Sequence, residues 1–145
     1  MGLFDFLRPK WKHSNPDVRI AAARATDDIE VLRKLASDDR DWFVRHRVFD
    51  EIRDRNLGGD SIYADLAKNS VDEEIRRKAV KKLKDEVLLA DIAKNEKFRY
   101  VRDAAEHRLD ELRRNIYGEK PAPQPSEAEP PEPQSSEPQS AQTAG

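Results

Sequence analysis

A short motif recurs four times along this chain, and its recurrence constrains the fold more than any other feature. Each copy is an apolar residue followed by arginine: Val18-Arg19, Val44-Arg45, Ile75-Arg76 and Val101-Arg102, at spacings of 26, 31 and 26 residues. A second row follows four positions after the apolar members, at Ala22, Val48, Ala79 and Ala105. Residues four apart lie on one face of a helix. The motif therefore predicts one helix per copy, which we call a VR helix.

A second series predicts a shorter helix before each of the last three VR helices. Its members are Leu35-Ala36, Leu66-Ala67 and Ile92-Ala93, and each alanine lies eight residues before the next VR pair. We call these LA helices. The single spacing of 31 carries five extra residues around Gly58-Gly59, which predicts a longer turn there. Two series in phase are typical of a stack of helical repeats.

The helix boundaries are also marked in the sequence. Asn15-Pro16 reads as an N-cap followed by proline at the first helical position. Residues 70–73 fit a capping box, and Asp41, Asp60 and Asp85 stand where caps or first-turn acids are expected. We expect helices over residues 16–25, 28–36, 72–84, 85–94 and 98–114, with another starting at residue 42.

A row of polar residues accompanies the arginines of the motif. Asp38, Asn69 and Asn95 lie seven residues before Arg45, Arg76 and Arg102. We expect a structural ladder in which these arginines, together with Arg19, bond to the turn side chains or to turn carbonyls, which would satisfy helix ends that stacking shields from water. The alternative is an arginine row that binds a ligand.

The motif L/I-A-x-D/N followed by V/I-R-x-x-A/V, over residues 15–114, resembles the short bacterial and archaeal form of the HEAT-like repeat family. It is also similar to the leucine-rich repeat variants. The resemblance implies an all-α protein, a right-handed α-solenoid of about four degenerate two-helix repeats. Such families are mostly protein-interaction scaffolds, and one branch contains lyases or chaperones that act on bilin chromophores. The first unit departs from the pattern at Thr26, where a large apolar residue is expected.

The chain divides into three parts. Residues 1–14 begin MGLFDFL, which predicts a segment that caps the open end of the first repeat; the alternative is a membrane-surface or partner anchor. Residues 15–118 form the repeat domain. Residues 119–145 hold seven of the nine prolines and no large apolar residue, so we expect a disordered tail with polyproline II character.

Composition limits the classes of function. The chain has no cysteine, no apolar run near the ~18 residues that span a membrane, and no secretory signal, so we expect a cytoplasmic protein without disulfides. Its net charge is −2; residues 119–145 contain five Glu and one Lys, hence −4, which leaves +2 for residues 1–118. A nearly neutral folded part argues against a dedicated nucleic-acid binder.

No catalytic pattern stands out. The sequence has no Gly-rich phosphate loop and no serine in a nucleophile-elbow context. His46 and His107 lie two repeats apart, on the order of 20 Å with helix layers ~8–10 Å thick, which is too far to share a metal. We therefore expect no enzyme activity, no cofactor and no metal.

The expected activity is binding of another protein by a monomer. The resemblance implies that the VR helices line the concave side, so we expect the partner on a ridge formed by their exposed residues. The candidate residues are Arg47, Lys78, Lys81, Lys82 and His107, with Trp42 at an aromatic lip where Phe43, Phe98 and Tyr100 hold similar places. One alternative is phosphate-backbone binding by the basic third VR helix, although the row Arg24, Asp50, Lys81, His107 is not continuously basic. Another, from the resemblance alone, is a bilin lyase or chaperone role.

Overall fold

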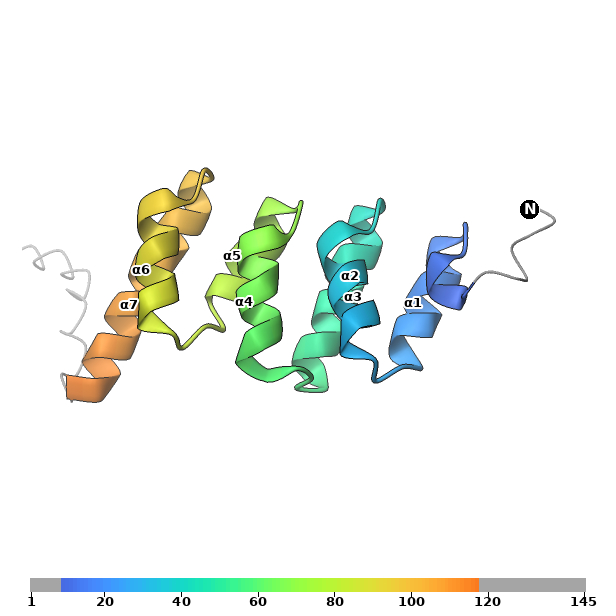
Figure 1. Ribbon diagram of the computed structural model, residues 1–145, viewed down its shortest axis with the longest axis horizontal. Helices are drawn as coiled ribbons and strands as arrows, with labels where there is room; N and C mark the ends of the chain where they lie inside the picture. Colours follow the sequence, from blue (N-terminus) through green and yellow to red (C-terminus); the bar gives the residue numbers. More distant parts are fainter. Residues whose placement is uncertain (1–8, 118–145) are drawn as a thin grey trace, which may run out of the picture.

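The structure is a computed structural model that describes residues 9–117, and every regular element in that range is helical (Figure 1). The prediction of an all-α fold is confirmed there. The elements are η2 (Lys10–Lys12, a 3₁₀ turn), α1 (Pro16–Arg24), α2 (Ile29–Asp38), α3 (Trp42–Asp54), α4 (Gly59–Asn69), α5 (Glu73–Val80), α6 (Glu86–Asn95) and α7 (Arg99–Tyr117). None of these helices is both long and apolar enough to cross a membrane.

The helices form two rows that run along the long axis of the molecule (Figure 1). One row holds the VR helices α1, α3, α5 and α7, and each of them contacts the next. The other row holds the LA helices α2, α4 and α6, which pack most extensively against α3, α5 and α7 respectively. The turn η2 packs against α1 at the N-terminal end of the row.

The buried core follows the predicted spacing in three of the four VR helices. In each of these helices, residues four positions apart are buried. They are Val44, Val48 and Ile52 in α3; Ile75 and Ala79 in α5, with Leu83 in the turn after it; and Val101, Ala105 and Leu109 in α7. In α1 the stripe differs, because Ile20 and Ala23 are buried while Val18 and Ala22 are only half-buried. The first helix has η2 rather than a full LA helix on one side, so it is packed in a different rotation.

Side-chain caps begin most of the helices. Asn15, Asp28, Asp41, Asp72 and Asp85 each accept a backbone N–H at the start of α1, α2, α3, α5 and α6. The capping box expected at Ser70 was wrong. Asp72 caps α5, and the Ser70 hydroxyl instead donates to the Ser37 carbonyl and accepts from the Asp72 N–H.

Two helix ends also differ from expectation. Helix α5 ends at Val80 rather than near residue 84, because Lys82 N–H and Leu83 N–H bond to carbonyls three residues earlier in tight turns. Helix α7 continues to Tyr117 rather than ending near residue 114, and Ile116 is 66% exposed.

The end segments lie partly beyond the described range. Trp11 packs against the core cluster. The apolar run in residues 1–8 and the tail from residue 118 fall outside the described residues, so the capping and disorder expected of them remain predictions.

Candidate interaction surface

The four motif arginines point into the turns that precede their own helices. Each donates to the carbonyl six residues earlier: Arg19 to His13 at 2.8 Å, and Arg45 to Asp39, Arg76 to Ser70 and Arg102 to Glu96 at 2.6 Å. Because each arginine bonds to a carbonyl six residues earlier, the bond connects the turn to the helix that follows it. The arginine row therefore has a structural role in every repeat.

Three of these arginines also bond an acid on the following turn of the row. Arg19 holds Asp39 through two bonds of 2.8 and 2.9 Å, and the pair is almost fully buried. Arg45 holds Asp72 at 2.9 Å, and Arg76 holds Glu96 at 2.7 Å. These acids come 20 to 27 residues after their arginines, so each pair joins one VR helix to the turn before the next VR helix.

The side chains predicted as ladder partners are not the partners. Asp38, Asn69 and Asn95 are exposed, and they bond to Ser37, Asp65 and Asp91 instead. The position that faces the arginine is one residue later, where Asp39 and Glu96 stand. In the third repeat that position is Ser70, and the helix cap Asp72 supplies the carboxylate.

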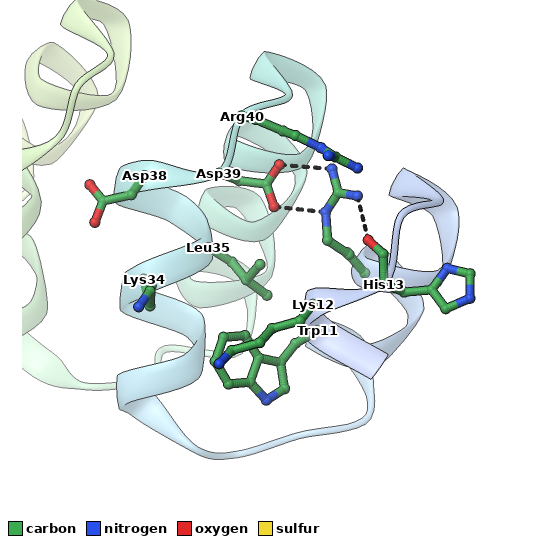
Figure 2. A pocket seen from close by; sticks show the side chains of 9 residues that line it. Trp11, Lys12, His13, Lys34, Leu35, Asp38, Asp39 and Arg40 are labelled. Atoms are coloured by element: carbon green, nitrogen blue, oxygen red, sulfur yellow. Dashed lines mark hydrogen bonds and ion pairs between the residues drawn. The ribbon is translucent and has the colours of Figure 1, made fainter. Parts of the chain in front are cut away.

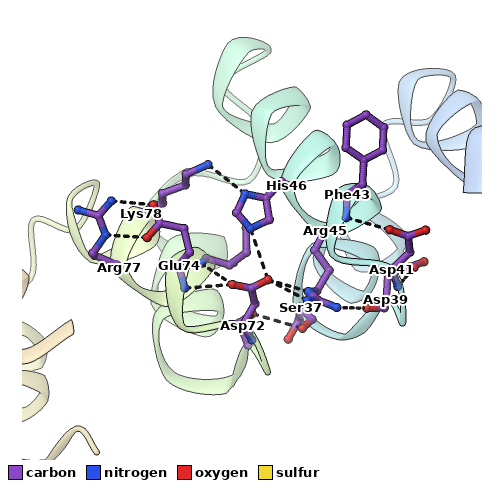
Figure 3. A network of polar contacts seen from close by, with 12 residues as sticks. Ser37, Asp39, Asp41, Phe43, Arg45, His46, Asp72, Glu74, Arg77 and Lys78 are labelled. Atoms are coloured by element: carbon purple, nitrogen blue, oxygen red, sulfur yellow. Dashed lines mark hydrogen bonds and ion pairs between the residues drawn. The ribbon is translucent and has the colours of Figure 1, made fainter. Parts of the chain in front are cut away.

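A polar network joins α3 to α5 around His46 (Figure 3). His46 Nε2 lies 3.4 Å from Asp72 Oδ2, the oxygen that also accepts from Arg45. His46 Nδ1 lies 3.3 Å from Lys78 Nζ. Because a lysine ammonium only donates, Nδ1 accepts in this arrangement and Nε2 carries the proton toward Asp72. The Trp42 ring packs edge-on against the same imidazole.

The acids of this network are held in their ionised form. Burial raises the pKa of Asp72, but hydrogen bonds from Arg45 and from the Ile75 N–H, with the nearby positive charge, outweigh burial and lower it overall. The hydrogen bonds from Arg77 lower the pKa of Glu74 in the same way. The network thus connects α3 and α5 through charged side chains.

Two of the predicted partner residues are less exposed than expected. Lys78 was expected to project freely, yet it is half-buried, bonds to His46 and lies over the Phe49 ring. Arg47 is also half-buried on α3. These contacts of His46 were not predicted from the sequence, because its partners come from a helix some thirty residues away.

A groove of about 580 Å³ lies between α5 and α7, and it brings together two of the predicted residues, Lys81 and His107. Its other lining residues are Arg77, Tyr100, Asp103, Ala104, Arg108 and Glu111. Ala104 occupies the repeat position that holds Arg47 in α3 and Lys78 in α5. The small side chain leaves space where α3 and α5 carry a long one.

The charged groups of the groove fall into two kinds. Arg77 is paired with Glu74 at 2.7 Å and Arg108 with Glu111 at 3.1 Å. Lys81 and Lys82 are exposed and have no acidic partner among residues 9–117, although Lys82 does not line the groove. Tyr100 is 69% exposed. The groove therefore offers an aromatic ring and an uncompensated ammonium group.

A separate aromatic patch lies at the start of α3. Trp42 is 64% and Phe43 45% exposed, and the two rings meet edge to face. Trp42 also borders a hollow of about 480 Å³ shared with Ser14, Pro16, Arg19, Arg40 and Asp41. Trp42 is thus exposed, as expected of a lip residue, but it does not share the groove of Lys81 and His107.

A third hollow of about 270 Å³ lies at the N-terminal end, beside η2 and α2 (Figure 2). Trp11 and Leu35 give it an apolar floor, and the Arg19–Asp39 pair stands at its side. No group of three or more His, Asp or Glu among residues 9–117 is placed to hold a metal ion.

Comparison of the chain with family models, with curated proteins and with solved structures found no match.

Proposed function

We propose that this chain is a right-handed α-solenoid of the HEAT-like type, without enzymatic activity, that binds another protein as a monomer. The binding surface is the row of exposed residues on α3, α5 and α7, which we call the VR ridge; the family resemblance implies that it lies on the concave side. The observation that carries the proposal is the combination of exposed Trp42 and Phe43 on α3 with the α5–α7 groove.

Exposed aromatic rings on a fixed helical frame are the usual anchors of protein interfaces. The VR ridge has two such places, the Trp42–Phe43 patch and Tyr100 in the groove. Their supporting helices are tied together by arginine–carboxylate pairs, so the rings are held in place before a partner arrives. This preorganisation lowers the entropy lost on binding.

Nucleic acid is the second candidate, supported by Lys81 and Lys82 at the end of α5. We rank it lower, because Asp103 and Glu111 line the same groove and Arg77 and Arg108 already have acidic partners. A phosphate backbone needs a continuous row of available cations. The bilin role has the resemblance alone in its favour.

The test is recovery of partners from native cell lysate by the tagged full-length chain, with and without nuclease. The double variant Trp42→Ala/Phe43→Ala and the variant Tyr100→Ala remove the anchors. Loss of a hot-spot side chain costs about 2 kcal/mol or more of binding free energy. We therefore expect the amount of protein partner recovered to fall at least roughly tenfold, while the melting temperature of the variant stays unchanged. Val87→Ala, at an exposed apolar residue of α6 in the other row, is the matched control.

Two outcomes would contradict the proposal. Equal recovery by the ridge variants would place the partner elsewhere on the protein. A partner that disappears on nuclease treatment would favour the nucleic-acid alternative.

A further inference from the structure

We infer that the α5–α7 groove is the docking site of this chain's own C-terminal segment, centred on Glu127–Glu132. The inference rests on the proposed function in one respect, since the docked segment would cover a part of the VR ridge that a partner needs. It is carried by the charge and shape of the groove and by the sequence and length of residues 119–145.

Three cationic side chains, Arg77, Lys81 and Arg108, line the groove against two carboxylates, Asp103 and Glu111, so positive charge is in excess there. Lys81, Lys82 and Lys84 are exposed at the end of α5 and in the turn after it. Every ion pair among residues 9–117 is made by Arg or His, so these ammonium groups have no acidic partner there. Arg108 of α7 donates to the Leu83 carbonyl at 2.9 Å, which holds this lysine turn against the groove.

The shape of the groove suits an extended chain that carries proline. Ala104 leaves the middle of the groove open, and the Tyr100 ring is exposed at its side. Proline-rich segments bind in aromatic-lined grooves because their extended conformation is already restricted, so little entropy is lost. A ligand for this groove should therefore combine proline with carboxylates.

Residues 119–145 have that composition. They contain five Glu, one Lys and seven of the nine prolines, with the run Glu-Ala-Glu-Pro-Pro-Glu at positions 127–132. Their net charge of −4 is opposite to the +2 of residues 1–118. They hold no large apolar residue, so carboxylates and proline rings are the groups they can offer.

The connection is long enough. His107 lies ten residues before Tyr117 on α7, about 15 Å at the helical rise. Glu127 lies ten residues after Tyr117, and ten extended residues span up to about 35 Å. The segment can therefore return to the groove of its own molecule, where short flexible linkers give effective concentrations of about a millimolar.

The test uses the full-length chain, which has no cysteine. A nitroxide spin label on Ser126→Cys would lie beside the proposed segment. In low salt, we expect the NMR amide signals of Lys81, Ala104 and His107 to lose at least half of their intensity. The amides of Lys34 and Lys68, on α2 and α4 of the other row, should stay unchanged. High salt should restore the groove signals by screening exposed charges.

Two full-length variants sharpen the result. Replacing Glu119, Glu127, Glu129, Glu132 and Glu137 by Gln should restore the signals by removing the charge. Ala104→Gln should restore them by filling the groove; Ala90→Gln, at an exposed alanine of α6, is its matched control and should keep the broadening.

Absent broadening, broadening spread evenly over both rows, or broadening that survives the Glu→Gln changes would each overturn the inference. So would broadening seen only between labelled and unlabelled copies, since the occupant would then be the tail of another molecule.

The measurement contains no partner, so its failure is separate from failure of the proposed function. If the tail contact exists and a partner uses the same groove, the Glu→Gln variant should recover severalfold more partner from lysate. A tail contact without that gain would place the partner elsewhere.

Discussion

At the scale of single residues, arginine and lysine have separate roles in this protein. The motif arginines are tied into turns, and Arg19 is only 4% exposed beside Asp39. The planar guanidinium has five donors in a fixed fork, so it can bind a carboxylate and turn carbonyls at once. An ammonium group is compact and strongly hydrated, which suits Lys81 and Lys82 at the exposed end of α5.

Substitution of Arg19 should therefore cost more stability than substitution of Arg102. Arg19→Ala leaves Asp39 buried without its partner, a situation that costs about 3–5 kcal/mol. Arg102 bonds to the Glu96 and Lys97 carbonyls and has no acidic partner among the described residues, so Arg102→Ala should cost about 1–2 kcal/mol. Urea unfolding of both variants measures the difference, and equal losses would contradict the role assigned to Asp39.

At the scale of elements, α4 begins unlike its neighbours. Most of the other helices begin with an Asn or Asp side chain as the cap, whereas α4 follows Gly58, which has φ of +75° and no side-chain cap. Gly59 also has positive φ, at +56°. Residues without a β-carbon adopt this conformation readily. The five-residue insertion is thus accommodated by backbone freedom rather than by a capping side chain.

The two glycines should respond differently to alanine. At Gly58 a β-carbon would lie 3.0 Å from two atoms of Ile62, a buried residue, whereas at Gly59 it would meet open space. The left-handed conformation alone costs about 1–2 kcal/mol for a residue with a β-carbon. We expect Gly59→Ala to cost about that much and Gly58→Ala clearly more. Thermal unfolding compares them, and a Gly59 variant that is the less stable would show that contact with Ile62 is not decisive.

At the scale of the whole molecule, a polar network supports one junction of the row. Helices α3 and α5 contact each other less than α1 and α3 or α5 and α7 do. The Arg45–Asp72–His46–Lys78 network lies at that junction (Figure 3). Its charges therefore contribute to joining the first half of the row to the second.

Because of this junction, the free energy of unfolding should depend on pH in the acidic range. The folded pKa of Asp72 is below its ordinary value, so its contribution is complete above about pH 4 and is lost as pH falls through the folded pKa. Asp72→Asn keeps a good helix cap but removes the charge. We expect it to lower the free energy of unfolding at pH 6 by about 1.5–3 kcal/mol. The loss of stability between pH 6 and pH 3 should become smaller.

The matched control is Asp28→Asn, because Asp28 caps α2 through backbone N–H groups and has no arginine partner among residues 9–117. Urea unfolding at the two pH values makes the comparison. If both variants keep the same acid dependence as the original chain, the Arg45–Asp72 pair does not set it.

Local sequence was enough to predict much of the helical framework. Apolar positions four apart predicted the buried rows of α3 and α7, and Asp41 and Asp85 marked the starts of α3 and α6. Periodicity and capping depend on neighbours within about one helical turn, so a single sequence contains them. The aromatic lip at Trp42 could also be anticipated, because its exposure follows from its position relative to the buried stripe.

The sequence by itself thus determined where most of the helices form and which faces α3, α5 and α7 bury. Only the tertiary structure decided which acid each arginine binds, that His46 joins Asp72 to Lys78, and that Ala104 opens a groove beside Lys81. These contacts join residues 20 or more positions apart. Asp38 and Asp39 are adjacent in the chain, but only the side chain of Asp39 bonds to Arg19, whereas that of Asp38 bonds to Ser37. Such directions are set by how neighbouring helices pack, which no local pattern in one sequence specifies.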